Sequence, residues 1–280
     1  MPELPEVEHV RRGVETLIGI PIENVRVGRR DVVRDEHAKR RGRLDHRLLL
    51  EGATVTGTRR HGKQLALIGS NGACVLVHLG MSGQLLVLDT GQRVSGGHAH
   101  VVWSLGDGRR LVFRDPRRFG GVWLLRRESD LDARWASLGN DGLVITGGAL
   151  CEALGASTRA VKAGLLDQSA VAGVGNIYAD EALFDAGINP GRPCNMLTEP
   201  EWDRLSVSVR AVLEEGFRRG GSTLRDYRRP DGSSGDAVAG HRVYGRGSKP
   251  CFRCENKLSQ AQIAQRTTVW CPRCQRVPPP

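Results

Sequence analysis

The stretch CFRCENKLSQAQIAQRTTVWCPRC, residues 251–274, contains two Cys-x2-Cys pairs separated by sixteen residues. Two residues between the cysteines of a pair let both thiolates reach one metal ion, and two pairs complete a tetrahedral set of four sulfurs. The spacer is long enough for a β-hairpin that returns the second pair to the first. An accidental cluster or a redox pair is the alternative, but the double spacing is far more specific than a single pair. The pattern predicts one structural Zn²⁺, with no open coordination position, held by Cys251, Cys254, Cys271 and Cys274.

The composition is that of a basic globular protein. The chain has 280 residues, with 41 Lys and Arg against 31 Asp and Glu, which gives a formal net charge of +10. Most of the excess falls in residues 218–280, where 13 basic residues face four acidic ones. Such charge can simply solvate a surface, but its concentration around the predicted zinc hairpin favours contact with a polyanion such as nucleic acid.

The cysteine count and the N-terminus indicate an intracellular protein. Seven cysteines, an odd number, occur in a chain whose first residues contain no apolar signal region. This combination argues against a disulfide framework. No run approaches the roughly 18 apolar residues that a membrane span needs. We therefore expect a soluble protein of the bacterial cytosol or nucleoid, with no membrane partner.

The N-terminal part combines one helix with short strands. Apolar residues recur at helical spacing, and they predict a helix over residues 5–18: Val7, Val10, Val14, Leu17 and Ile18. Two dipeptides that favour tight hairpin turns, Asn71-Gly72 and Asp107-Gly108, are each flanked by apolar runs. The expected strands are residues 65–68, 74–79, 85–88, 101–105, 111–114 and 122–125. Residues 1–132 are thus predicted to form an antiparallel β-sandwich with a leading helix.

The pattern changes after this sandwich, so the fold class is predicted to be α+β. Residues 133–150 are aperiodic and are interpreted as a linker. Residues 151–240 have helical periods, with a capping box at Thr198 and Glu201, and end in a loop rich in Gly and Ser. Residues 241–280 form the zinc hairpin. The C-terminal part is therefore expected to be a helical domain followed by a metal-stapled hairpin.

Five motifs resemble one known family. They are MPELPEVE at residues 1–8, HLGMSGQL at 78–85, RDPRRFGG at 114–121, LLDQSAVAGVGNIYADEALF at 165–184 and QRTTVWCPRC at 265–274. In this order the chain resembles the formamidopyrimidine-DNA glycosylases, bacterial enzymes that excise 8-oxoguanine. The resemblance implies a helix–two-turn–helix domain and a bifunctional glycosylase and abasic-site lyase, which repairs oxidised purines in duplex DNA by β,δ-elimination. Leu4, where the endonuclease VIII branch typically has Gly, favours the purine branch.

The resemblance also implies the catalytic residues. Pro2 would be the nucleophile once Met1 is removed, because a terminal α-amine, with a pKa of about 8 in peptides, is partly neutral near pH 7. Glu3 would move protons to the sugar or the departing base, and Lys63 would contact phosphate and act in elimination. Glu6 and Glu181 would be supporting carboxylates. For Glu6, helix-start electrostatics is an equally good explanation.

The same resemblance also implies which residues contact DNA. A lesion in duplex DNA must be flipped out, and apolar wedges fill the gap. Met81, Arg117 and Phe119 correspond to the family's wedge. Four further residues would bind DNA: His98, Lys162, Asn176 and Arg266.

Two features leave the base preference open. The segment over residues 222–243, which should cap the lesion, departs from the family, and Arg225 stands where Lys is common. An oxidised-pyrimidine glycosylase of the same architecture is the second interpretation, and a non-catalytic zinc-ribbon DNA-binding protein is the third. A monomer would suffice for one flipped base, and the expected partner is double-stranded DNA with damaged bases.

Overall fold

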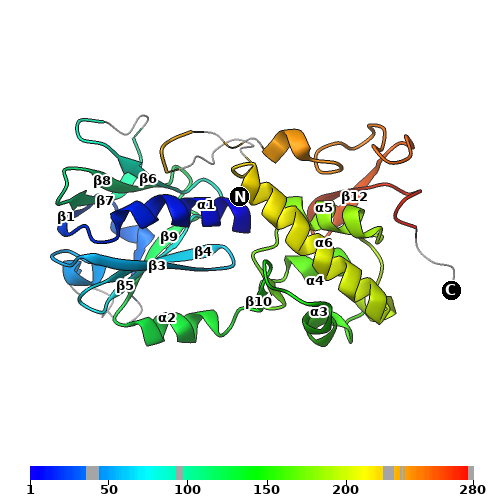
Figure 1. Ribbon diagram of the computed structural model, residues 1–280, viewed down its shortest axis with the longest axis horizontal. Helices are drawn as coiled ribbons and strands as arrows, with labels where there is room; N and C mark the ends of the chain where they lie inside the picture. The colour runs from blue at the N-terminus through cyan, green and yellow to red at the C-terminus, as the bar shows by residue number, and fades with distance from the viewer. Residues whose placement is uncertain (36–43, 93–96, 223–229, 234, 236, 277–280) are drawn as a thin grey trace. The chain divides into compact units, whose positions relative to one another are not determined.

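The computed structural model describes residues 1–35, 44–92, 97–222, 230–233, 235 and 237–276 (Figure 1). The chain divides into two compact units. The N-terminal unit comprises Met1–Ala136 and Arg219–Asp236, and the C-terminal unit comprises Ser137–Arg218 and Ala237–Pro280. The segment Arg219–Asp236 thus groups with the sandwich, whereas the sequence placed it with the helical domain. The boundaries of the four predicted segments stay a prediction.

The N-terminal unit is a sandwich of two sheets. One sheet has the strand order β1-β7-β8-β6 and the other β2-β9-β5-β4-β3. The strands are β1 (Ile22–Val27), β2 (Val33–Arg34), β3 (Val55–His61), β4 (Gln64–Gly69), β5 (Cys74–His78), β6 (Gln84–Leu88), β7 (Ala99–Leu105), β8 (Arg110–Arg114) and β9 (Gly121–Leu125). The unit also contains the helices α1 (Leu4–Val14) and α2 (Glu128–Trp135) and three short 3-10 turns, Glu15–Leu17, Arg30–Val32 and His46–Leu49.

Both predicted hairpins are present. Gly72 joins β4 to β5 with φ of 79°, and Gly108 joins β7 to β8 with φ of 84°, a conformation that glycine adopts without steric cost. Apolar side chains from both sheets and from α1 form one buried core that includes Val10, Trp103 and Phe113. Every described strand pair in this unit is antiparallel except β2 with β9, which is parallel.

The leading helix begins one residue earlier than predicted and ends four residues sooner. It covers Leu4–Val14 with Pro5 in its first turn, and its apolar side is buried against the sandwich. The segment Arg219–Asp236 returns to this helix. Pro230 lies so close to Gly13 that a Cβ there would be 2.3 Å from the ring, and the Pro230 carbonyl accepts the Val87 N–H at 3.0 Å. A side chain at Gly13 would displace the returning segment.

The C-terminal unit is helical and ends in a hairpin. Its elements are β10 (Asn140–Asp141), α3 (Gly147–Leu154), α4 (Val161–Leu166), β11 (Val171–Ala172), α5 (Asn176–Ala186), α6 (Glu199–Arg218), two 3-10 turns (Cys194–Met196 and Ala237–Gly240), β12 (Ser259–Ile263) and β13 (Arg266–Trp270). The predicted capping at α6 is present, since Glu201 accepts the Thr198 N–H at 2.9 Å. None of the helices in the described ranges has the length and apolarity of a membrane span.

Residues 133–150 are not the irregular linker that the sequence suggested. The end of α2, the short strand β10 and the start of α3 all fall within them. Helix α3 begins because the Thr146 hydroxyl accepts the Ala149 N–H at 3.2 Å, and Leu150 and Leu154 are buried. The stretch is too short and too rich in Gly for its periodicity to be visible.

One buried carboxylate joins α1 to β3. Glu8 accepts hydrogen bonds from Arg11, Arg12 and Arg60 at 2.7–3.0 Å. Burial acts to raise the pKa of Glu8, but the three guanidinium groups outweigh it and lower the pKa from 4.5 to about 2. The interaction therefore stabilises the fold fully above the unfolded pKa and is lost as the pH falls through about 2.

We predict that Glu8→Gln lowers the free energy of unfolding by about 2–4 kcal/mol at pH 7, because three guanidinium groups lose a largely buried counter-charge. Urea titrations from pH 7 to pH 2 measure this, and the difference from the wild type should shrink as the pH falls from 4.5 towards 2. Glu15→Gln is the control, since Glu15 is exposed and its pair with Arg11 contributes less than about 1 kcal/mol. Equal effects of the two substitutions at pH 7 would contradict the analysis.

Candidate functional site

The start of the chain is fixed by a carboxylate four residues on. Pro2 and Glu3 are both buried at the entrance to α1. Glu6 is 1% exposed, and its Oε2 accepts the Glu3 N–H at 2.8 Å while its Oε1 accepts the Ser222 N–H at 2.7 Å. Glu6 was predicted to be a supporting carboxylate or to stabilise the start of the helix, and these contacts give it a third role. It holds the residue next to Pro2 and also the segment that returns from α6.

Lys63 lies at the turn between β3 and β4, directly after Gly62, whose φ is 54°. The residue is buried, with 8% of its surface exposed. Gln64 pairs with His78 across β4 and β5, so Lys63 is a near neighbour of that imidazole. Burial first, and then the charges of Lys63, Arg134 and Arg34, lower the pKa of His78. Positive charge therefore gathers at this end of the five-stranded sheet.

The three predicted wedge residues come from two loops that pack against each other. Met81 and Phe119 are exposed by 37% and 55%, and the Arg117 guanidinium lies 4.7 Å from the Phe119 ring centre. Gly80 makes the close approach possible, because a Cβ there would lie 2.5 Å from the backbone of Phe119. Apolar side chains this exposed in a tightly packed loop are suited to insertion between bases.

Sequence reasoning missed the residue that shapes these loops. Asp115 is fully buried and accepts hydrogen bonds from the Ser82 hydroxyl at 2.6 Å and from the Gly120 N–H at 2.7 Å. Its carboxylate also accepts the Arg117 N–H at 3.2 Å. Asp115 therefore joins the loop of Met81 to the loop of Phe119. Its place in the motif RDPRRFGG was a signal, but the motif did not show which way the side chain points.

His98 lies directly before β7, an inner strand of the four-stranded sheet. It is exposed, adopts a φ of 64°, and its ring centre is 6.3 Å from that of His100. His100 is buried, and its Nε2 lies 2.8 Å from the Asp115 carbonyl oxygen. The exposure of His98 suits a surface contact with DNA, which remains a prediction.

The structure corrects the assignment of Lys162 to a DNA phosphate. Its side chain is fully buried, and its ammonium lies 2.7 Å from an Asp180 oxygen and donates to the Thr268 hydroxyl at 2.8 Å and the Thr267 carbonyl at 3.1 Å. These contacts match the three protons of an ammonium group, and none faces solvent. The other Asp180 oxygen accepts the Val269 N–H at 3.1 Å. Lys162 and Asp180 instead join α4 and α5 to strand β13.

Asn176 and Arg266 meet at the same strand. Asn176 is the first residue of α5, and its side-chain N–H donates to the Thr267 carbonyl at 3.1 Å. Arg266 precedes Thr267, opens β13 and is exposed. It follows a two-residue turn in which Ala264 and Gln265 have φ of 49° and 57°. The contacts of Lys162 and Asn176 therefore fix the backbone beside Arg266.

Glu181 is buried and binds three consecutive backbone N–H groups. Its oxygens accept those of Arg242, Val243 and Tyr244 at 2.8–3.1 Å. This contact holds the stretch that leads into the first cysteine pair. The predicted lesion-capping residues 223–229, including Arg225, lie outside the described residues.

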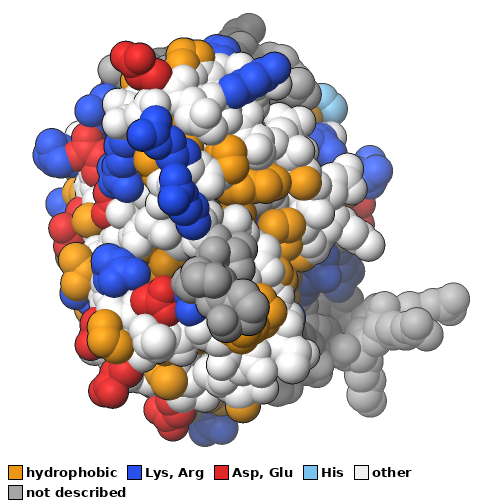
Figure 2. All heavy atoms as spheres, turned by 90° about the vertical axis from the view of Figure 1, so that its right-hand side faces the viewer, with side chains coloured by type: hydrophobic (Ala, Val, Ile, Leu, Met, Phe, Trp, Pro, Cys, Tyr) orange, Lys and Arg blue, Asp and Glu red, His pale blue; other side chains and the backbone are white. Residues whose placement is uncertain are grey.

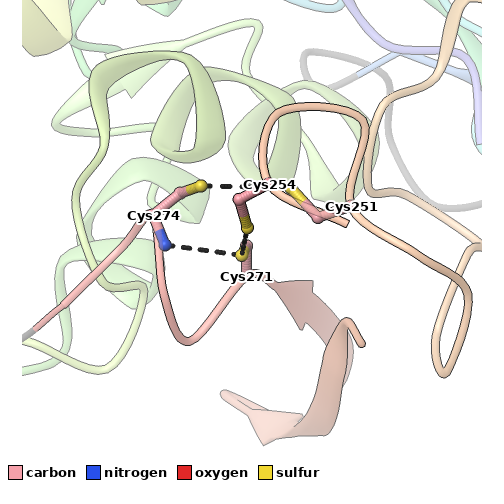
Figure 3. Close-up of side chains that lie close together, drawn as sticks. All are labelled: Cys251, Cys254, Cys271 and Cys274. Carbon is pink, nitrogen blue, oxygen red and sulfur yellow. Dashed lines mark hydrogen bonds between the residues drawn. The ribbon is translucent and has the colours of Figure 1, made fainter. Parts of the chain in front are cut away.

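The four predicted cysteines converge (Figure 3), and their sulfur atoms all lie within 4.8 Å of one another. The sulfurs of Cys251 and Cys274 are 4.0 Å apart, and those of Cys254 and Cys271 are 3.4 Å apart. Tetrahedral coordination with Zn–S bonds of about 2.3 Å places sulfurs about 3.8 Å apart. Backbone N–H groups of Arg253 and Cys274 also point to the sulfurs of Cys251 and Cys271. The donor set fits one structural Zn²⁺.

Figure 2 shows Lys and Arg side chains close to exposed hydrophobic side chains, with acidic side chains among them, on one face of the molecule. Basic side chains with apolar ones between them can meet both the phosphates and the bases of a nucleic acid.

Comparisons with known proteins cover nearly the whole chain. Family models match three parts: the formamidopyrimidine-DNA glycosylase N-terminal domain at residues 1–122, the H2TH domain of the same enzymes at 143–228, and a zinc finger found in FPG and IleRS at 248–277. A formamidopyrimidine-DNA glycosylase of Xanthomonas oryzae pv. oryzae is 44% identical, covering 99% of this chain and 100% of its own. Its counterpart from Xanthomonas campestris pv. campestris is 42% identical with the same coverage.

Solved structures agree with these matches. The MutM (Fpg) protein of Thermus thermophilus superposes with a TM-score of 0.83 at 38% identity, covering 99% of this chain and 100% of its own. The Lactococcus lactis enzyme in complex with DNA containing Fapy-dG has a TM-score of 0.86 at 30% identity. Its complex with DNA containing an abasic site also has a TM-score of 0.86 at 30% identity. Each Lactococcus structure covers 98% of this chain and 100% of its own.

We predict that Lys162→Met and Asp180→Asn impair DNA binding equally, because both break one buried pair behind Arg266. A phosphate contact would behave differently: Lys162→Met alone would then reduce the slope of log K against log salt by about 0.9. Fluorescence anisotropy over a range of salt concentrations separates these outcomes. Each single substitution should also lower stability by about 3–5 kcal/mol, because it leaves a buried charge unpaired, so binding is measured below the unfolding temperature of each variant.

We predict that the purified protein contains one zinc ion and that chelation destroys the hairpin. Cys151 is the exposed cysteine outside the cluster, so a thiol reagent should label it rapidly and label four more thiols after chelation. Metal analysis and thiol titration measure both quantities. DNA binding should disappear with the metal while the sandwich of the N-terminal unit keeps its β signal in circular dichroism. The prediction would be wrong if the purified protein contained no zinc and its four cluster thiols reacted before any chelator was added.

Proposed function

The chain belongs to the formamidopyrimidine-DNA glycosylase family, and from this we propose that it excises oxidised purines from duplex DNA and then cleaves the strand. The protein is a base excision repair enzyme with glycosylase and abasic-site lyase activities. The observation that carries its chemistry is the buried Pro2-Glu3 start of the chain, held by Glu6. The site residues below are proposals that this arrangement supports.

Pro2 is the proposed nucleophile. Removal of Met1 converts the Pro2 nitrogen from an amide into a secondary amine with a free lone pair. That nitrogen attacks C1′ of the sugar, the bond between C1′ and the base breaks, and the base leaves with the bonding electrons and takes up a proton. The sugar ring opens as O4′ gains a proton, which Glu3 beside the amine can deliver, and an iminium then joins Pro2 to C1′.

The iminium makes strand cleavage possible because it accepts electrons from the neighbouring carbon. Loss of a C2′ proton lets the C3′–O bond break and releases the 3′ phosphate. A second elimination breaks the C5′–O bond, and water then hydrolyses the link to Pro2. Lys63, buried beside the strand ends, is the proposed residue for phosphate contact and for the later elimination.

The partner is double-stranded DNA that contains a damaged base. Met81, Arg117 and Phe119 are the proposed wedge, and their exposure on two interlocked loops supports this role. His98, Asn176 and Arg266 are proposed contacts to the DNA, with Arg266 at the tip of the zinc hairpin. Within the C-terminal unit, Lys162 holds the strand of Arg266, and Glu181 holds the stretch before the first cysteine pair. We propose a monomer that works in the bacterial cytoplasm.

Borohydride trapping tests the proposal. The purified protein is incubated with duplexes that contain 8-oxoguanine opposite C, an oxidised pyrimidine or an abasic site, and borohydride then reduces any iminium to a stable amine. We expect a covalent band with 8-oxoguanine and with the abasic site, and its loss in Pro2→Gly. Intact mass must show that Met1 is absent, because an amide nitrogen cannot attack.

The matched variant Glu3→Gln separates base release from strand cleavage. Excision of 8-oxoguanine should fall by about 10²–10⁴-fold, since proton transfer is lost, while trapping on the abasic site persists. Trapping on the oxidised pyrimidine alone would show that the enzyme acts on oxidised pyrimidines instead of purines. The structure of a Lactococcus lactis relative has been solved with DNA that contains an oxidised pyrimidine. The absence of any covalent band would leave a zinc-containing DNA-binding protein.

A further inference from the structure

A tryptophan and two arginines form a group on the outer face of the five-stranded sheet. The guanidinium carbons of Arg34 and Arg134 both lie 5.0 Å from the centre of the Trp123 ring. Arg34 is the β2 residue that pairs with Trp123 of β9, and Arg134 comes from α2. Three separate elements therefore bring these side chains together. We call Arg34, Trp123 and Arg134 the arginine platform.

The ring of the platform is held in place by its surroundings. Gly121 lies beneath it, and a Cβ there would be 3.2 Å from the indole ring. The His78 ring meets it edge-on at 6.4 Å between centres. Trp123 is partly exposed on a strand whose other described residues are buried. The indole is thus a fixed surface that orders two long cationic side chains.

An arginine over an aromatic face can still bind an anion through its edge. The π contact uses the flat face of the guanidinium, whereas its N–H donors lie in the plane and point outwards. The edge of each guanidinium matches the oxygen atoms of a phosphodiester backbone. A surface of this kind needs no base contact and has no sequence preference.

The platform is continuous with the proposed site. His78 touches Trp123 on one side and is a cross-strand partner of Gln64, next to Lys63, on the other. The charges of Lys63, Arg134 and Arg34 all act on His78. The nearby carboxylate of Asp31 is already bound by Arg29 and Arg118. Helix α2 also brings Glu128, Asp130 and Asp132 to this region, where they pair with Arg59 and Arg127.

We propose that the arginine platform is a second phosphate-binding surface, which holds the DNA backbone away from the flipped nucleotide and lengthens the footprint of the enzyme. This inference rests on the proposed function, because it takes Lys63 as the contact nearest the lesion. The ligand is the phosphodiester backbone of the same duplex.

The test compares Arg34→Gln/Arg134→Gln with the wild type on two duplexes that carry a stable abasic-site analogue. One duplex extends only a few base pairs beyond the lesion, and the other is several times longer. On the long duplex we expect the slope of log K against log salt to fall by about 1.8, corresponding to two lost phosphate contacts. On the short duplex both proteins should bind equally.

The matched control is Arg47→Gln/Arg109→Gln, which removes two charges from turns of the same unit. It should leave both slopes unchanged. An equal loss in the control and the platform variant would show a general charge effect and overturn the proposal, as would an unchanged slope in the platform variant. Trp123→Leu keeps both charges and should weaken binding to the long duplex alone, and a melting curve confirms that it is folded.

Single-turnover cleavage keeps this test separate from the proposed function. With enzyme in saturating excess, the platform variant should cleave 8-oxoguanine DNA at the wild-type rate and trap to the same extent. Failure of wild-type trapping would count against the glycosylase mechanism. A length-independent loss of binding in an enzyme that traps normally would count against the platform alone.

Discussion

A carboxylate with almost no access to water holds the start of the chain, and the chemistry depends on it. Glu6 accepts one backbone N–H from Glu3 and another from Ser222, more than two hundred residues further along. A buried carboxylate needs donors for its oxygens, so these two N–H groups must be in place together. Because Pro2 is bonded to Glu3, these contacts tie the proposed nucleophile to the segment that follows α6.

The same arrangement recurs at three other buried carboxylates. Asp115, Asp180 and Glu181 are buried carboxylates: Asp115 and Glu181 accept backbone N–H groups from loops, and Asp180 accepts the Val269 N–H of β13. These segments carry the proposed wedge residues, follow Arg266 or lead into the first cysteine pair. Hydrogen bonds to a charged acceptor contribute about 1.5–3 kcal/mol each, more than neutral ones. These hydrogen bonds therefore fix the backbone of each segment, and the fixed backbone sets the direction of its exposed side chains.

Local patterns predicted the elements, and long-range contacts explain what they missed. Asn71-Gly72, Asp107-Gly108 and the cysteine spacing each specify a structure within a few residues, and all three were correct. Lys162 was misassigned because its partners Thr267 and Thr268 lie about a hundred residues away. A sequence shows that a lysine is present, but only the fold shows whether its ammonium is buried. The family motif predicts a functional lysine at this position, but it does not show which groups the lysine contacts.

The hairpin tip shows why the C-terminal unit needs a metal. Ala264 and Gln265 both adopt positive φ, which costs a residue with a side chain about 1–2 kcal/mol, and neither is the Gly or Asn that such turns favour. A two-stranded hairpin alone is too weak to hold that strain. The four cysteines fasten its open end, and the buried pair of Lys162 and Asp180 fastens its side. Strained backbone persists where its surroundings fix it, and here it sets Arg266 at the first position of β13.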